Sequence, residues 1–193
     1  MRSIFSLTVL FFIFSTVSGC ATQASREIQF RGEKLGNAPN NGMKKIPEYE
    51  EILGIIISPF SSGYVKPDEP LTLGHIAIKY VLYEYHQDKL YQITVKTAPE
   101  NSQFCPNRAE IVRALENNFA IKMRWFEEDH IQRSYLAQWR GNDAWVTYNC
   151  MREHGGEHFS ITHGPTFEKI FNLEKAKREE EMNDRSKVIE RSF

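Results

Sequence analysis

Residues 144–163 read AWVTYNCMREHGGEHFSITH, a stretch in which apolar and polar residues alternate on both sides of two glycines. Gly155 and Gly156 favour a two-residue hairpin turn because both positions can take positive φ. The strands flanking such a turn place one set of apolar and aromatic side chains on a single face: Val146, Tyr148, Cys150, Phe159 and Ile161. The stretch therefore predicts a β-hairpin with one apolar face.

Residues 76–97, IAIKYVLYEYHQDKLYQITVKT, predict a second hairpin with its turn at Gln87 and Asp88. In the simplest register, one face carries the alternating apolar residues of both strands: Ile78, Tyr80, Leu82, Tyr91, Ile93 and Val95. We expect this face to belong to the core. Tyr83 and Tyr85 then point to the opposite side.

A helix is predicted between the two hairpins. Pro106 suits a first helical position and Asn107 can cap the helix. An apolar stripe follows at helical spacing: Ile111, Val112, Leu115 and Phe119. Residues 121–125 alternate again and predict a further strand.

The expected fold class is α+β, with a mainly antiparallel sheet of about five to six strands packed on one helix, plus a charged C-terminal helix. This single domain is expected to span residues 47–172. The second helix starts near Phe167, and charge dominates it over residues 173–193, which we interpret as a solvated helical tail.

The N-terminus carries a targeting signal. Arg2 is followed by an uncharged stretch from Ile4 to Val17, then by Val17-Ser18-Gly19-Cys20. These 14 residues are too few for a membrane-spanning helix, which needs roughly 20, and fit the apolar region of a signal peptide. The last four residues resemble the lipobox of bacterial lipoproteins. The resemblance implies a signal peptide over residues 1–19 and a lipidated Cys20, the alternative being an ordinary cleaved signal with Cys20 unmodified.

The resemblance also implies a location. Ala21 follows the cysteine at a position where lipoproteins kept at the inner membrane typically have aspartate, so we expect an outer-membrane anchor facing the periplasm. Residues 20–46 show neither a helical nor a strand period, and we interpret them as a flexible tether.

Cys105 and Cys150 are the two cysteines that remain after Cys20. In an oxidising compartment such a pair is interpreted first as a disulfide. Cys150 lies on the apolar strand face and Cys105 directly precedes the helix expected to cover that face, which supports the pairing. The alternative is two buried free thiols.

His154, Glu157 and His158 match the H-x-x-E-H pattern of inverted zinc peptidases. That chemistry needs both histidines one helical turn apart, whereas Gly155 and Gly156 favour a turn that points them to opposite faces. We therefore expect no metal site and no cofactor here.

Composition and patterning favour a binding function. Removing residues 1–19 leaves 23 Lys and Arg against 25 Asp and Glu, which argues against a nucleic-acid partner. The outward side of the two hairpins carries Tyr83, Tyr85, Trp145 and Met151, a surface suited to an envelope protein or glycan. The alternative is that residues 47–75 or the helix from Phe167 cover this side. We thus predict a membrane-anchored binding or envelope-scaffold module; the alternative is a hydrolase acting on envelope polymers.

Overall fold

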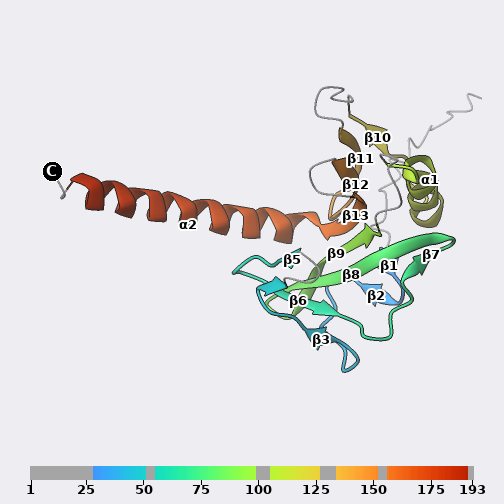
Figure 1. The fold of residues 1–193 in the computed structure, drawn as a ribbon, viewed down its shortest axis with the longest axis horizontal. Helices are drawn as coiled ribbons and strands as arrows, with labels where there is room; N and C mark the ends of the chain where they lie inside the picture. The colour runs from blue at the N-terminus through green and yellow to red at the C-terminus, as the bar shows by residue number, and fades with distance from the viewer. Residues whose placement is uncertain (1–27, 51–54, 99–104, 127–133, 152–155, 191–193) are drawn as a thin grey trace, which may run out of the picture.

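A computed structural model describes residues 28–50, 55–98, 105–126, 134–151 and 156–190. Its fold is α+β with an antiparallel sheet and two helices, as predicted (Figure 1). Within the described residues the sheet has nine strands, more than the five to six expected. Several additional strands are only two residues long, and strands this short carry no alternation that a sequence pattern could reveal.

The long strands lie in the middle of the sheet and the short ones near its edges. The strand order is β10-β11-β12-β13-β9-β8-β6-β3, with β7 pairing beside β8. The strands run as follows: β3 Lys44–Lys45, β6 Ser62–Val65, β7 Thr72–Leu73, β8 Ile76–His86, β9 Lys89–Thr97, β10 Arg124–Trp125, β11 Ser134–Arg140, β12 Ala144–Met151 and β13 Gly156–His163.

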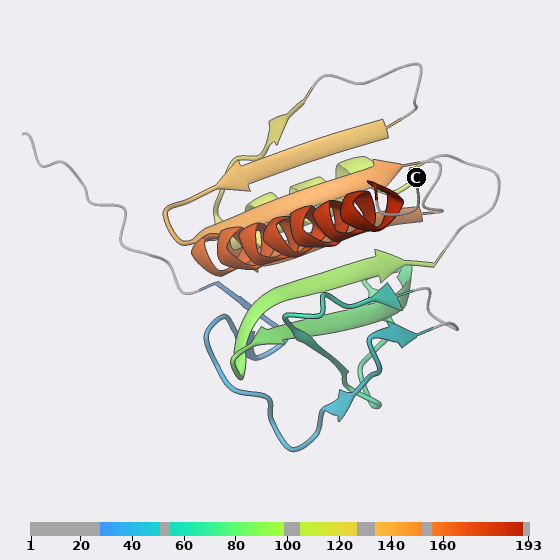
Figure 2. The same cartoon turned by 90° about the vertical axis from the view of Figure 1, so that its left-hand side faces the viewer.

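The two helices lie on opposite faces of β12 and β13 (Figure 2). The first, α1 (Arg108–Phe119), buries Ile111, Val112 and Leu115 against what we call the inner face. The second, α2 (Gly164–Glu190), starts on the outer face. The predicted apolar stripe of the first helix is therefore confirmed, because its buried residues share one cluster with Val146 and Ile161.

The β12–β13 hairpin keeps its predicted faces but not its predicted register. A two-residue turn at the glycines would pair His154 with Glu157, whereas the structure pairs Cys150 with Glu157. The register differs by four residues, and an even shift leaves every side chain on its face. The predicted apolar residues are all buried in the core: Val146, Tyr148, Cys150, Phe159 and Ile161.

The β8–β9 hairpin has its predicted turn, in which Gln87 and Asp88 both take positive φ. Its pairing, however, is shifted by one residue at Lys79 in β8 and again near Tyr91 in β9. Each β-bulge adds one residue to one strand and exchanges the faces beyond it. After the first bulge the inward residues of β8 are therefore Val81, Tyr83 and Tyr85.

Residues 28–46 pack on the domain, which differs from the flexible tether that we predicted. They contain a small hairpin of β1 (Gln29–Phe30) and β2 (Glu33–Lys34), followed by β3. The Phe30 ring contacts Phe159 edge-on at 5.9 Å, and Ile28 is buried. These residues cover part of the inner face that α1 leaves open.

Part of the outer face is covered as well. β4 (Tyr49–Glu50) pairs with β5 (Ile55–Ile56), and a second apolar cluster forms around Leu82: Ile46, Ile55 and Ile57. This is the covering arrangement that the sequence left open as an alternative.

Helix α2 leaves the body as a long arm (Figure 1). Ile170 is buried, but every side chain from 171 to 187 is exposed except Glu174, which is half-buried. Glu174 thus marks where the helix departs from the sheet. None of the helices among the described residues is long and apolar enough to span a bilayer.

Candidate functional site

Two residues of the predicted binding surface lie in the core. Tyr83 and Tyr85 are 0% and 2% exposed, so the prediction that they form an outward surface is wrong. The cause is the bulge at Lys79, which turns both rings inward. The Tyr83 hydroxyl donates to Glu69 at 2.7 Å, and burial together with this bond raises the pKa of Tyr83.

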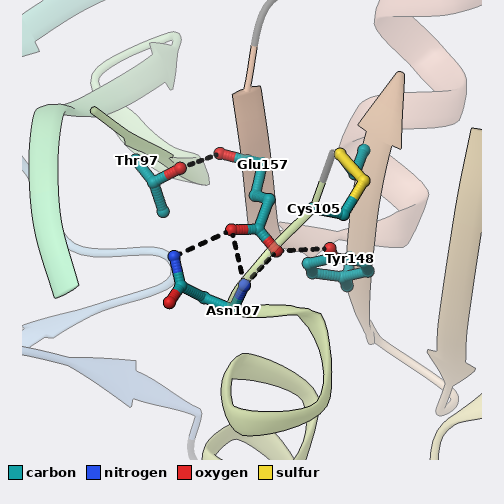
Figure 3. The surroundings of a disulfide bond; sticks show 6 residues. Thr97, Cys105, Asn107, Tyr148 and Glu157 are labelled. Atoms are coloured by element: carbon teal, nitrogen blue, oxygen red, sulfur yellow. Dashed lines mark hydrogen bonds between the residues drawn. A yellow bond between two sulfur atoms is a disulfide. The ribbon is translucent and has the colours of Figure 1, made fainter. Parts of the chain in front are cut away.

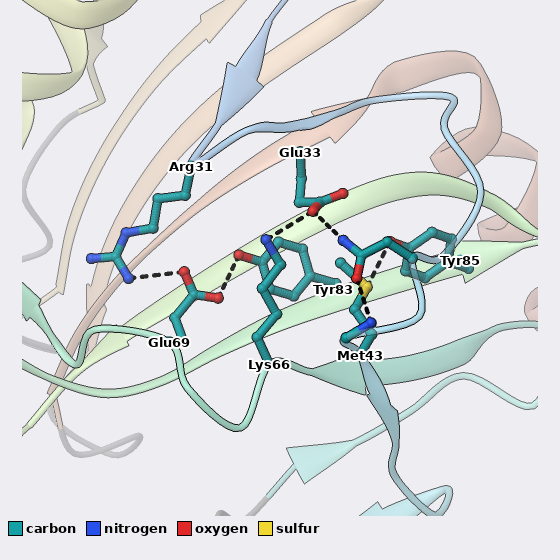
Figure 4. Close-up of polar contacts among 9 residues, drawn as sticks. Arg31, Glu33, Met43, Lys66, Glu69, Tyr83 and Tyr85 are labelled. Atoms are coloured by element: carbon teal, nitrogen blue, oxygen red, sulfur yellow. Dashed lines mark hydrogen bonds and ion pairs between the residues drawn. The ribbon is translucent and has the colours of Figure 1, made fainter.

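The inward tyrosines lie under a layer of paired charges (Figure 4). Arg31 contacts Glu69 at 3.0 Å and Lys66 contacts Glu33 at 2.8 Å. Arg31 also donates to the carbonyl oxygens of Pro70 and Thr72, both at 2.6 Å. A cavity of about 500 Å³ opens beside these residues. Both cations of this cluster, Arg31 and Lys66, already bind carboxylates. We therefore interpret the cluster as a structural contact that holds the N-terminal segment on the sheet.

Trp145 is half-buried at the base of α2. Its ring contacts Phe167 edge-on at 5.7 Å, and the Arg140 guanidinium lies 4.5 Å from the ring centroid. Phe171, one helical turn beyond Phe167, is 50% exposed. We call these four residues the arm-base surface. The side chain of Met151, the fourth predicted surface residue, lies outside the described part.

The predicted disulfide is present. Cys105 and Cys150 are bonded, and their Cα atoms lie 6.2 Å apart (Figure 3). The bond joins the segment that enters α1 to β12, on the inner face.

Glu157 lies beside the disulfide and is 2% exposed. Its carboxylate accepts hydrogen bonds from the backbone N–H and the side-chain amide of Asn107 at the start of α1, and from the Tyr148 hydroxyl at 2.9 Å (Figure 3). A carboxylate is favourable at a helix N-terminus, where backbone N–H groups lack helical partners. Sequence reasoning missed this role, although Glu157 has the same strand parity as Phe159 and Ile161.

A second buried carboxyl group, Glu84, lies on the outer face. It is 7% exposed and accepts hydrogen bonds from Gln92 Nε2 at 2.8 Å and from the Tyr91 hydroxyl at 3.2 Å. The Thr162 hydroxyl of β13 donates to the side-chain Oε1 of Gln92 at 3.3 Å, which links the group to the strand that leads into α2. We call Glu84, Tyr91, Gln92, Thr162 and Glu174 the arm seat. No sequence pattern indicated this cluster.

The remaining predicted positions fall elsewhere. Cys20 and His154 lie outside the described residues. Within the described part of the chain, no three His, Cys, Asp or Glu side chains come together as a metal site. His158 pairs with Asn149 in the sheet, and His163 Nδ1 lies 2.8 Å from Thr166 Oγ1 at the start of α2.

Comparison of the chain with protein-family models, with curated proteins and with solved structures finds no match. The molecule's own surfaces are therefore what points to a function. The described polar clusters tie segments together, whereas the arm-base surface leaves aromatic side chains in solvent. Such exposed aromatic residues are typical of binding sites.

Proposed function

We propose that the protein is an exported lipoprotein, anchored through Cys20 to the outer membrane and facing the periplasm, which binds another envelope protein through its arm-base surface. The Val17-Ser18-Gly19-Cys20 resemblance supports the anchor. The bonded pair Cys105–Cys150 fits an oxidising compartment. The binding role rests on one observation: Phe167 and Phe171 remain 38% and 50% exposed beside Trp145.

The chemistry of this surface favours a protein over a glycan. Exposed phenylalanine rings, one arginine and a tryptophan are the residue types enriched at protein interfaces. A glycan partner would be a different outcome of the tests below.

The orientation of the arm suits this role. β1, the described element that follows Cys20 most closely in sequence, lies in the half of the body away from the free end of α2 (Figure 1). A chain held near β1 by a lipid would therefore present the arm away from its anchor.

The anchor is tested by replacing Cys20→Ser and fractionating cells. We expect the variant to leave the membrane fraction, because the lipid that holds it is lost. A variant that stays fully membrane-bound would contradict the anchor.

The binding surface is tested by photo-crosslinking in intact cells, with a photoreactive amino acid placed at position 171. Position 126 is the matched control, because Phe126 is 43% exposed at the distant β10 edge. We expect one discrete protein adduct from position 171 and none from position 126. Adducts from position 126 alone would place the binding site at the β10 edge and contradict the arm-base surface. A carbohydrate adduct would show that the partner is a glycan and not a protein.

A further inference from the structure

We propose that a proton on the Glu84 carboxyl group holds the base of α2 on the sheet, and that loss of this proton weakens that contact. The proposal concerns the conformation of the arm and stands independently of what the arm-base surface binds.

The contacts of Glu84 are those of a carboxyl group without a counter-charge. Its two hydrogen-bond donors, Gln92 Nε2 and the Tyr91 hydroxyl, are both neutral. An ionised carboxylate in such a buried place would lose its hydration without gaining a cation. Burial, with a smaller contribution from Glu174, raises the pKa of Glu84 to about 7, against the hydrogen bonds from Tyr91 and Gln92, which lower it.

The position of Glu174 connects this group to the arm. Glu174 follows Ile170 by one helical turn and is the last half-buried side chain of α2 before the exposed stretch up to residue 187. The helix contacts β9, the strand whose Tyr91 and Gln92 hydrogen-bond Glu84, and it leaves the sheet at Glu174, whose charge contributes to the raised pKa of Glu84. A neutral Glu84 does not repel Glu174, whereas an ionised Glu84 carries the same charge as Glu174, and this repulsion opposes the packing of α2 on the sheet.

Other titratable groups near Glu84 belong to the sheet. Tyr80 and Tyr91 have pKa values raised by burial and by Glu84 itself, so both hydroxyls stay neutral through the neutral pH range. His86 shares the strand face of Glu84, and its Nδ1 donates to the Phe60 carbonyl oxygen at 2.8 Å. His163 ends β13 next to the start of α2, and its Nδ1 lies 2.8 Å from Thr166 Oγ1.

The test is an NMR titration of the purified full chain between pH 5 and 9. The carboxyl ¹³C signal of Glu84 reports its protonation, and the backbone amides of residues 170–178 report the seat of the arm. We expect both sets to change together with a midpoint near pH 7, with faster amide exchange at the high-pH end.

Three variants separate the causes. Glu84→Gln keeps the shape and should abolish the transition of the helix amides, whereas Glu174→Gln should move the Glu84 midpoint to lower pH because it removes the like charge. His163→Gln, the matched control, should leave the transition in place. The proposal is overturned if the transition survives in Glu84→Gln, if it disappears in His163→Gln, or if Glu84 titrates while the helix amides do not respond. If Glu84→Gln does not fold, the Glu174→Gln variant still tests the proposal: a Glu84 titration midpoint equal to that of wild type would overturn it.

Discussion

The two helices are joined to the same sheet in different ways. α1 is held on the inner face by a disulfide next to its first turn and by a carboxylate, Glu157, that accepts hydrogen bonds from Asn107 and Tyr148. α2 is held on the outer face by apolar contacts of Ile170 and Phe167 and by the arm seat around Glu84. Both junctions bury a glutamate, but only the first surrounds it with a helix N-terminus.

The difference shows that a buried glutamate can either stabilise the junction between a helix and a sheet or make that junction depend on pH. Donors at a helix N-terminus compensate the lost hydration of a carboxylate, and a covalent bond beside it limits how far the elements can separate. At Glu84, two neutral donors compensate much less of the lost hydration, and the neighbouring carboxylate Glu174 disfavours the ionised form further. We therefore expect the α2 junction to respond to pH through Glu84.

The largest expected effect concerns the covalent part of the α1 junction. Cys105 and Cys150 are separated by 45 residues, and closing a loop of this size stabilises a fold by about 4 kcal/mol in the chain-entropy model. Reducing the bond should lower the free energy of unfolding by that order, as measured by denaturant titration with and without reductant. An unchanged midpoint would mean that non-covalent contacts alone fix α1.

The next effect concerns the α2 junction. The pKa of Glu84 rises from 4.5 to about 7 in the folded protein, so the folded state binds this proton more tightly than the unfolded state does. Its contribution to stability is complete below pH 4.5 and is lost as the pH rises through 7. At pH 8, Glu84→Gln should therefore unfold with a free energy about 3 kcal/mol higher than wild type.

The two proteins should have similar stabilities at pH 4, which makes the low-pH measurement the internal control. Glu168→Gln is the matched variant, since Glu168 is an exposed acid on the same helix. Equal stabilities of wild type and Glu84→Gln at pH 8 would remove the contrast between the junctions.

A smaller change, a loss of stability, is expected when Glu157 is replaced. In Glu157→Gln the amide N–H₂ group faces the Asn107 donors in place of a carboxylate oxygen, and the charge at the helix N-terminus disappears. We expect the free energy of unfolding to fall by about 2 kcal/mol in thermal or denaturant unfolding. Glu110→Gln, at an exposed acid in the first turn of α1, should change it by less than about 0.5 kcal/mol. A loss at Glu110 as large as that at Glu157 would argue against the specific contacts.

The smallest effects on stability belong to the exposed rings. Phe171→Ala and Phe126→Ala should each stay within about 0.5 kcal/mol of wild type, because both side chains lie on the surface and are already exposed to solvent over about half of their area. Phe171→Ala should nevertheless weaken the adduct that forms in cells from a photoreactive amino acid placed at position 167 of the arm-base surface, while Phe126→Ala keeps that adduct. Loss of folding in Phe171→Ala, seen as a lowered thermal midpoint, would place this ring in the fold and not in a binding surface.

Several features were predictable from the chain because they depend on local pattern. The alternation around Val146 and Phe159 defines an apolar face that survives an even change of register, so the core residues of β12 and β13 and the position of Cys150 followed directly. The spacing of Ile111, Val112 and Leu115 defined α1. Gln87 and Asp88 formed the predicted turn, with the positive φ at both positions that a type I′ hairpin requires.

Tertiary structure alone decided the rest. A single extra residue at Lys79 exchanges the faces of β8, and tyrosine is amphipathic enough to occupy either face, so the pattern could not show that Tyr83 and Tyr85 turn inward. The strands of residues 28–46 are too short to show an alternating pattern in the sequence. They form because their apolar side chains are buried against the part of the inner face that α1 leaves open. The seat of α2 depends on Glu84, Gln92, Thr162 and Glu174, which are far apart in the chain and acquire their shared chemistry only when the sheet brings them together.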